Sequence, residues 1–503
     1  MSNQTKKSEF NKVLSSTDIL VIAFGAMIGW GWVVSTGDWI NNGGVVGAAL
    51  GFVIGGIMIF FVGLTYAELT AALPQCGGEH VFSYKAMGPT GSFICTWGII
   101  FGYVSVACFE ACSLPTVVAY IFPGFLKGYL YTVAGFDVYA TWLALAILIA
   151  VFITAINIRG VKTAAILQTI LTAIIFAVGM AIIITSYIRG DVGNLADQMF
   201  IGDTSGERTK HVLRAACVTP FYFIGFDVVP QAAEEISGSL KKIGKILILS
   251  ILFAVAFYAL IILGVGRILN SSQIAESMAG SGLVTADAMR IAFNSKAIAD
   301  VCIIGGICGI ITSWNAFMIG GSRAMYSMAD SYMIPDAFAK LHPKYKTPTN
   351  ALLLIGALTV ISPLAGRPML IWACDVGNLG CCLAYCMVSM SFLILRKKAP
   401  DMPRPYMVKN YKFVGWTAVI LSGAMVLMYL IPGSGSTLAA QEWAIAGGWT
   451  LLGVIFYFLN KKKYGAEFGR HIDIEIDYTQ DDLEAINVHE KEIKEELEAE
   501  HHA

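Results

Sequence analysis

Long apolar runs separated by short polar segments make up most of the chain. Twelve of these runs are long enough to cross a bilayer, and each is expected to be a helix because backbone groups in hydrocarbon must bond to one another. The runs lie near residues 17–41, 45–72, 91–122, 137–157, 163–188, 212–235, 243–266, 298–328, 350–366, 369–395, 412–432 and 443–460. The pattern predicts an all-α integral membrane protein with twelve transmembrane helices.

The composition supports this interpretation and excludes other classes of protein. Of the 503 residues, 56% are hydrophobic and 14% are charged, and the mean hydropathy is +0.67. An ordinary soluble domain has about 25% charged residues. With a formal net charge of −1, the chain offers no broad basic surface. A lipid bilayer is therefore the expected surrounding, and nucleic acid is not an expected partner.

The distribution of lysine and arginine indicates the orientation. If both termini are cytoplasmic, most of the 34 lysines and arginines fall on the cytoplasmic side, as the positive-inside rule requires. We therefore expect a multi-pass protein, of the plasma membrane, with both termini inside. The acidic tail (464–503) is expected to be solvated, with a charged helix near 481–500; a regulatory role is the alternative.

The first apolar run contains three closely spaced glycines, Gly25, Gly29 and Gly31. Each weakens a helix by roughly 1 kcal/mol relative to alanine. An unwound stretch in a membrane survives where it lines a cavity, and the amide groups that it frees favour an anion. The run is expected to break there and to bind a substrate carboxylate. Close packing of helices at small residues is the alternative.

The sixth apolar run supplies a matching interruption. Pro220, Gly225 and Asp227 lie within it. Interrupted segments at corresponding positions of two halves indicate the binding site of a transporter. The two interrupted runs are five spans apart, which is the spacing of two inverted five-helix repeats, although the symmetry is visible only in the spacing.

Four motifs in consistent order resemble the amino acid–polyamine–organocation (APC) superfamily of transporters. They are the Gly-rich break at 25–31; the Tyr-Ala-Glu-Leu run at 66–69 with Pro74, Gly77, Gly78 and Tyr84; the segment 221–227 with Glu234 and Glu235; and the loop that contains Ser322, Arg323, Asp330, Pro335 and 342–348. The resemblance implies a LeuT-type 5+5 inverted repeat plus two C-terminal helices, and transport of amino acids or amines. The expected parts are a cytoplasmic N-terminus (1–16), the repeats (17–188 and 212–395), helices 11 and 12 (412–460) and the tail (464–503).

The resemblance also implies the substrate-binding residues. Backbone amides of Ile28, Gly29, Trp30 and Gly31 would hold the carboxylate, Phe221 would form an aromatic gate, and Ile224 and Gly225 would lie beside it. Many relatives have a small residue where this chain has Trp30, so a reshaped pocket is expected.

Two acids lie inside apolar runs, Glu110 and Asp227. Such residues normally face a cavity or a partner. Asp227 is expected at the substrate. Glu110 is expected either to bind a substrate ammonium, to carry a proton, or to be a protonated residue that bonds a neighbouring helix.

The coupling ion is a separate question. Proton-coupled relatives often carry a lysine at the position of Ile175. The sodium-coupled branch of this fold uses oxygens that correspond here to Gly25, Ile28, Gly309, Thr312 and Ser313. Five neutral oxygens suit Na⁺, which is the only cofactor considered, and no metal centre is predicted. Proton coupling through an acid and uncoupled exchange are the rivals; Thr312 and Ser313 bonded to carbonyls of their own helix is the structural alternative.

The combined reading is a secondary transporter of amino acids that works by alternating access. A carrier of amines or polyamines on the same fold is the main rival, and a substrate sensor that signals through its tail is another. An enzyme is not expected, because no Ser/His/Asp arrangement and no histidine cluster is visible. Glu68, Glu79, Glu234 and Glu235 are expected in ion pairs at a gate or interface, with Arg323 and Lys85 as candidate partners.

Overall fold

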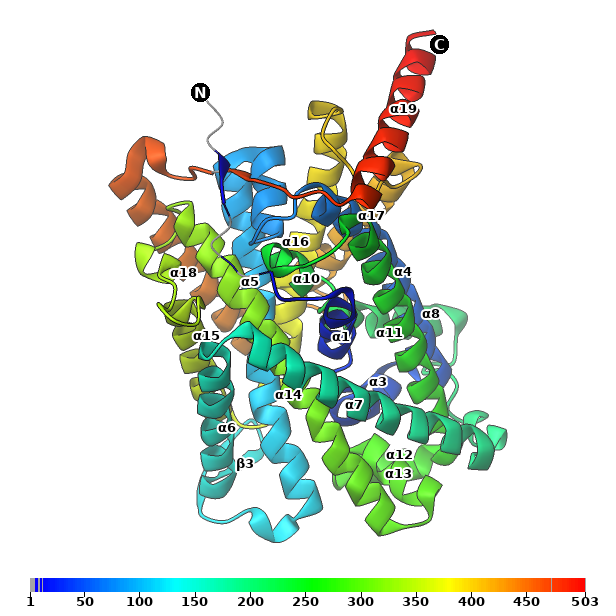
Figure 1. Ribbon diagram of the computed structural model, residues 1–503. Helices are drawn as coiled ribbons and strands as arrows, with labels where there is room; N and C mark the ends of the chain where they lie inside the picture. Colours follow the sequence, from blue (N-terminus) through cyan, green and yellow to red (C-terminus); the bar gives the residue numbers. More distant parts are fainter. Residues whose placement is uncertain (1–4, 8–9, 11, 472, 503) are drawn as a thin grey trace.

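The computed structural model describes residues 5–7, 10, 12–471 and 473–502. This part of the chain is a helical bundle (Figure 1). Eleven of its helical segments are long and apolar enough to cross a membrane, and a shorter apolar stretch, Thr349–Ala365, lies at the predicted ninth span. The prediction of an all-α membrane protein is confirmed at this level.

The first half of the chain forms the elements α1 (Ser16–Met27), α2 (Gly31–Val34), α3 (Thr36–Gly43), α4 (Val45–Ala72), α5 (Glu79–Ile121), η1 (Pro123–Phe125), β2 (Tyr129–Val133), β3 (Phe136–Tyr139), α6 (Ala140–Ile158), α7 (Val161–Arg189) and η2 (Val192–Leu195). It is preceded by the short strand β1 (Thr5–Lys6). Strands β2 and β3 pair as an antiparallel hairpin before α6.

The second half forms α8 (Ser205–Cys217), α9 (Thr219–Phe223), α10 (Val228–Gln231), η3 (Ala233–Glu235), α11 (Leu240–Ile268), α12 (Ser271–Ala279), α13 (Val284–Phe293), α14 (Lys296–Asp330), η4 (Asp336–Ala339), α15 (Thr349–Ile361), η5 (Ser362–Ala365), α16 (Met369–Lys398), α17 (Tyr411–Leu430) and α18 (Ala440–Tyr464). The tail adds η6 (Gly465–Glu467), β4 (Asp473–Ile474) and α19 (Gln480–His502).

The predicted spans match these helices to within a few residues, with instructive differences. The run 17–41 is three helices, and the run 212–235 is divided among α8, α9, α10 and η3. Helix α5 begins well before residue 91 because Gly88, at a φ of +74°, joins two helical stretches across a kink. The hairpin and helices α12 and α13 were not predicted, because they are short segments of mixed polarity.

Helix α5 is buried along most of its length and forms the centre of the bundle. Helices α14 and α16 pack along it, while α11 packs along α4. Helices α17 and α18 are peripheral and expose large apolar side chains such as Phe413, Trp416 and Phe458. Exposed apolar surface on this scale fits contact with lipid.

Both chain ends lie on one face of the bundle (Figure 1). The tail is docked there, so the prediction of a solvated tail is wrong for its first half. Strand β4 pairs in parallel with β1, and Asp473 forms an ion pair with Lys85 at 2.6 Å. The ring of His471 and the ammonium of Lys85 hold the pKa of the Asp473 carboxyl well below its usual range. The predicted charged helix is present as α19.

Candidate functional site

The first interruption lies where the glycines predicted it. Helix α1 ends at Met27, α2 begins at Gly31, and Ile28 and Trp30 have non-helical backbone angles. The carbonyls near the break find partners on other helices: Tyr258 of α11 donates to Met27 O at 2.7 Å, and Thr285 of α13 donates to Trp32 O at 2.8 Å. These bonds replace those that a continuous helix would make, as burial in a membrane requires.

The second interruption separates α9 from α10. Ile224 leaves the helical region, and Gly225 has a φ of +145°. Only glycine adopts this conformation readily. A Cβ on Gly225 would also lie 2.7 Å from both the Cβ of Ala26 and the backbone nitrogen of Met27. The two broken helices therefore touch at Gly225, with no room for a side chain between them.

Glu110 reaches the first break from α5. A Cβ on Gly29 would lie 2.6 Å from Glu110 Oε1 and 2.9 Å from the Ser313 side chain. The carboxyl group faces the Trp30 amide and the Ser313 hydroxyl, both of which can donate to it. Its Oε2 atom is buried without a partner. The structure thus brings Glu110, Gly29, Trp30 and Ser313 together at the break, where a ligand that carries a positive group would find an acceptor.

Asp227 lies at the second break, but its carboxylate is engaged. Oδ1 accepts the amide of Gly225 at 2.7 Å, and Oδ2 accepts the hydroxyl of Tyr385 at 3.0 Å. The backbone carbonyl of Asp227 accepts the hydroxyl of Tyr103 at 3.0 Å. These bonds hold the interrupted segment against α5 and α16. The arrangement gives Asp227 a positioning role and leaves Glu110 as the acid that can turn to a ligand.

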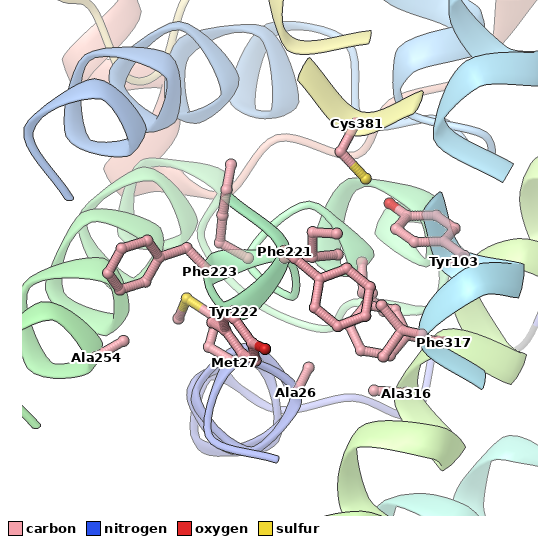
Figure 2. Close-up of a cluster of buried hydrophobic side chains, with 14 of the residues drawn as sticks. Ala26, Met27, Tyr103, Phe221, Tyr222, Phe223, Ala254, Ala316, Phe317 and Cys381 are labelled. Atoms are coloured by element: carbon pink, nitrogen blue, oxygen red, sulfur yellow. The ribbon is translucent and has the colours of Figure 1, made fainter. Parts of the chain in front are cut away.

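Aromatic side chains of α9 surround the meeting point of the breaks. Figure 2 shows Phe221 and Tyr222 directly above Ala26 and Met27 of α1, with Phe223 on the opposite side of α9. The ring of Phe221 packs against Phe109 of α5 at 5.3 Å and is almost fully buried. Its amide donates to Asn378 of α16 at 2.7 Å. Phe221 is therefore held between α5 and α16.

The indole of Trp30 is accommodated by α14. A Cβ on Gly306 would lie 1.5 Å from the Trp30 ring, so this glycine leaves the notch that the ring fills. Trp30 also packs edge-to-face with Trp32 at 5.2 Å. The bulk at position 30, which the sequence suggested would reshape the pocket, is absorbed largely by α14.

A cavity of about 760 Å³ opens on the face that carries β3, α12 and α13, opposite the two termini (Figure 1). We call it the vestibule. Tyr222, Trp39 and Ser35 lie in its wall, and the Tyr222 ring packs so closely on Gly31 that a Cβ there would lie 2.5 Å from it. Tyr222, rather than Phe221, thus separates the vestibule from the breaks. The side chains of Asp38 and Arg367 line the same cavity.

Buried ion pairs close the bundle on the side of the termini. Arg323 donates to Glu235 at 2.9 Å, and both side chains are almost fully buried. Glu68 accepts from Arg396 at 2.6 Å and from Arg404 at 3.1 Å. We call these five residues the termini-side ion pairs. The expected pairing of Arg323 is confirmed with Glu235, whereas Lys85 pairs with the tail.

Glu234 and Glu79 are the remaining two acids of that prediction. Glu234 accepts the amide of Cys76 at 2.9 Å. Glu79 contacts the side chain of Gln231, and within the described residues it forms no ion pair. The expectation of an ion pair at Glu79 is therefore wrong.

The candidate Na⁺ residues come together only in part. The Thr312 hydroxyl lies 3.1 Å from Gly25 O and 3.0 Å from Gly309 O. Gly309 also lies against the carbonyl of Gly29 and the side chain of Ile175. Ile175 occupies the position at which proton-coupled relatives often carry a lysine. Ser313, however, faces Glu110 and Gly29.

Amide and hydroxyl side chains next to this group were not foreseen. Thr172 and Gln168 of α7 press against Gly25, and Asn315 donates to Gln168 at 3.2 Å. Other residues that the sequence reasoning missed are Tyr222, Asn378 and Tyr385. A polar residue inside an apolar run, such as Gln168, Asn315 or Asn378, was the available signal. The tyrosines gave none, because tyrosine is common in transmembrane helices.

The chain is similar in sequence to known transporters. A family model described as amino acid permease matches residues 14–456. The methylthioribose transporter of Bacillus subtilis (strain 168) is 26% identical over 477 residues, which cover 92% of this chain and 96% of that protein. The branched-chain amino acid permease BcaP of the same organism is 26% identical over 473 residues, with 91% and 95% covered. The aspartate-proton symporter of Bacillus subtilis (strain 168) is 26% identical over 496 residues, which cover 90% of this chain and 90% of that protein.

Proposed function

Because this chain belongs to the amino acid permease family, we propose that it carries amino acids across the membrane by alternating access to a site at the two helix breaks. The observation that supports this most is the contact of Gly225 with Ala26 and Met27. It joins two interrupted helices in mid-bundle, beside an acid that has a free acceptor atom. Discontinuous helices that meet near the membrane centre are the usual site of such transporters.

The proposed ligand is an amino acid with both its charges in use. Its carboxylate takes the amides at the first break, which now face Glu110, and its ammonium pairs with the Glu110 carboxylate. An amine or polyamine without a carboxylate is the second candidate. A polyamine would need more than one free acid at the site, and the bonds of Asp227 to Gly225 and Tyr385 leave Glu110 for this purpose. A simple amine could pair with Glu110 but would not use the amides at the first break. The amino acid is therefore favoured.

The conformation supports alternating access. The vestibule reaches Tyr222 from one face, while the termini-side ion pairs close the other. In the proposed cycle the vestibule is extracellular, both termini are cytoplasmic, and twelve crossings form a 5+5 repeat plus two helices in the plasma membrane. Substrate enters past Tyr222, and separation of the termini-side ion pairs then opens the path inward. The even number of crossings agrees with chain ends on one face (Figure 1).

Na⁺ remains a proposed coupling ion on the strength of the Thr312 group. The Thr312 hydroxyl lies 3.1 Å from the carbonyl oxygen of Gly25 and 3.0 Å from that of Gly309, which are two of the other expected oxygens. Ser313 would have to turn away from Glu110 to complete the set. The proposal therefore predicts that Na⁺ and ligand binding affect each other through Ser313.

The test is uptake into proteoliposomes with a panel of amino acids and of amines, with and without a sodium gradient. We expect amino acids to be taken up and amines to compete weakly. Gly225→Ala should reduce uptake more than tenfold, because a Cβ at this φ is strained and pushes the breaks apart. Gly206→Ala is the matched control, since nothing lies near a Cβ there. Wild-type levels of uptake in Gly225→Ala, or transport of amines alone, would contradict the proposal. No response to sodium, together with unchanged uptake by Thr312→Ala, would remove the ion site.

A further inference from the structure

The buried acids of the bundle differ in what neutralises them. Glu68 and Glu235 have arginine partners. Asp227 accepts an amide and a tyrosine hydroxyl. Glu79, at the first turn of α5, is fully buried and forms no ion pair within the described residues. An unpaired charge is costly to bury, and such a group takes up a proton instead.

The surroundings of Glu79 are polar but uncharged. The amide of Gln231 contacts one carboxyl oxygen, while the other, Oε1, is buried without a partner. The hydroxyl of Tyr66 faces the carboxyl group and is itself buried without another partner. A protonated Glu79 can donate a hydrogen bond to the hydroxyl oxygen of Tyr66 or to the side-chain carbonyl of Gln231, both of which are buried without another partner. An ionised Glu79 has no proton to donate.

A second acid shares this interior. Tyr66 packs edge-to-face on Tyr385 at 5.8 Å, and Tyr385 donates to Asp227. The titratable groups that face Glu79 are Asp227, Tyr66, Tyr103, Cys95 and Cys381. None of these carries a positive charge. Two carboxyl groups in one low-dielectric interior do not both ionise readily. The amide of Gly225 and the hydroxyl of Tyr385 both donate to Asp227 and favour its charge, so the proton belongs on Glu79. Because Glu79 lies in the first turn of α5, the helix dipole favours its charged form. Burial and the nearby Asp227 both favour the neutral form, and together they outweigh the dipole.

Glu79 also lies where the bundle must open. The amide of Gly77 donates to Gln231 O at 3.4 Å, and a Cβ on Gly78 would lie 2.7 Å from Pro230. The segment before α5 thus rests directly on the end of α10, the second half of the broken element. Any movement of α10 that separates the termini-side ion pairs also uncovers Glu79.

We propose that Glu79 is a proton-binding site whose occupancy is coupled to opening of the termini side. This inference rests on the proposed transport function. With the termini side closed, Glu79 holds the proton on its carboxyl group. When α10 moves, water reaches the group, the proton leaves to that water, and the carboxylate remains. The carboxylate regains its proton from the vestibule side once the termini side has closed, so each cycle carries one proton inward and a proton gradient drives net movement of substrate. The site is separate from Glu110 and from the Thr312 group.

The experiment uses full-length protein in proteoliposomes with equal Na⁺ concentrations on both sides, loaded with a fluorescent pH indicator, and a mixture of the standard L-amino acids as the probe. Two quantities are measured: internal acidification with net uptake under an inward proton gradient, and exchange of labelled for unlabelled amino acids without a gradient. We expect wild type to do both. Glu79→Gln, an isosteric change, should keep exchange but lose gradient-driven uptake and acidification. Glu475→Gln, an exposed acid of the tail, is the matched control and should behave as wild type.

The outcomes separate this inference from the proposed function. If wild type shows no exchange, transport of amino acids itself is wrong. If wild type exchanges but Glu79→Gln keeps full gradient-driven uptake, the proton site is wrong. Loss of both activities in a Glu79→Gln protein of normal thermal stability also overturns it, since Glu79 would then serve the structure alone. Tyr66→Phe provides a second test that keeps Glu79: without the hydroxyl the carboxylate is less favoured, so the pH of half-maximal uptake should move upward. An unmoved pH profile contradicts the assignment.

Discussion

Glu110 decides the chemistry of the site at the scale of single residues. It is the acid at the breaks that keeps an unpartnered oxygen, and it faces the Trp30 amide that a substrate carboxylate would use. Substrate carboxylate and Glu110 therefore compete for the same donor. Binding of an amino acid requires Glu110 to exchange the amide for the substrate ammonium, which links affinity to the freedom of one side chain.

The Glu110→Gln variant tests this role. An amide keeps the volume but cannot pair with an ammonium, and a charged hydrogen bond contributes about 1.5–3 kcal/mol. We expect the KM for amino acids to rise by at least about tenfold, since 1.4 kcal/mol is a factor of ten, with thermal stability close to wild type. Glu276→Gln, at an exposed position of α12, is the control. An unchanged KM in concentration-dependent uptake would show that Glu110 does not bind the ligand.

Some residues of the site were predictable from the sequence and others were not. Gly225 was foreseen as part of a break because glycine and proline disturb an apolar run in a way that is visible locally. The hydrogen bond from Tyr385 to Asp227 was not foreseen, because it joins residues 158 positions apart. Nothing in the local sequence around either residue indicates the other as its partner. Asp227 was consequently expected at the ligand, whereas the structure gives its carboxylate to the break itself.

At the scale of elements, the termini-side ion pairs connect parts that must separate during transport. Arg323 of α14 and Glu235 of η3 are buried together, so neither charge has water as a substitute partner. Such a pair stabilises the closed arrangement because separating it inside the protein would leave a buried charge without a partner. Opening must therefore hydrate both groups at once, which makes it a concerted step.

Removing one member should be severe and removing both should be mild. We expect Arg323→Met to lower the free energy of unfolding by about 3–5 kcal/mol, because it leaves a buried carboxylate unpaired. Adding Glu235→Gln should restore much of the loss. Arg470→Met breaks an exposed pair with Glu467 and should change stability by less than about 1 kcal/mol. Thermal unfolding in detergent measures all three; equal effects of Arg323→Met and Arg470→Met would refute the argument.

The elements themselves were largely predictable. Length and hydropathy located the spans, since a bilayer imposes both on every crossing helix. The split of the first and sixth runs followed from their glycines and proline. Helix α12 was missed because its apolar residues are few, although Asn270 caps it through Gln273 in a recognisable pattern. The hairpin before α6 has no comparable signal against an apolar background.

At the scale of the whole molecule, the tail ties distant parts together. Asp482 is fully buried and accepts the amide of Lys241 at 3.0 Å and the hydroxyl of Ser239 at 2.8 Å, at the start of α11. His489 bonds Arg404 O at 2.7 Å, between α16 and α17. None of these contacts follows from the composition of the tail, whose many charges suggested solvent. The tail docks because a few of its side chains have specific hydrogen-bond partners, although its average composition is polar and charged.

The tail contacts give a pH dependence with a definite sign. The pKa of Asp482 is lowered, since the bonds from Lys241, Thr479 and Ser239 outweigh its burial, and that of Asp473 is lowered by His471 and Lys85. A carboxyl with a depressed pKa in the folded state stabilises docking above its unfolded value, about 3.9, and loses that contribution as pH falls through the folded value. Tail docking should therefore hold at neutral pH and weaken progressively below about pH 4.

Limited proteolysis of residues 468–490 measures this docking. Asp482→Asn should increase cleavage of the tail at neutral pH, because it removes the charge that caps α11. Asp481→Asn should not, because Asp481 pairs with Lys242 at 3.4 Å in a solvent-exposed position. Equal protection of the two variants would show that Asp482 does not hold the tail.

The parallel pairing of β1 with β4 has a consequence for biosynthesis. Strand β1 precedes all the membrane-spanning helices in the chain and β4 follows all of them. During synthesis β1 therefore stays unpaired until all the membrane-spanning helices have been made, and it can pair only once translation has passed β4. A prematurely terminated polypeptide keeps a bare strand edge at its N-terminus, the kind of edge that invites pairing with other chains.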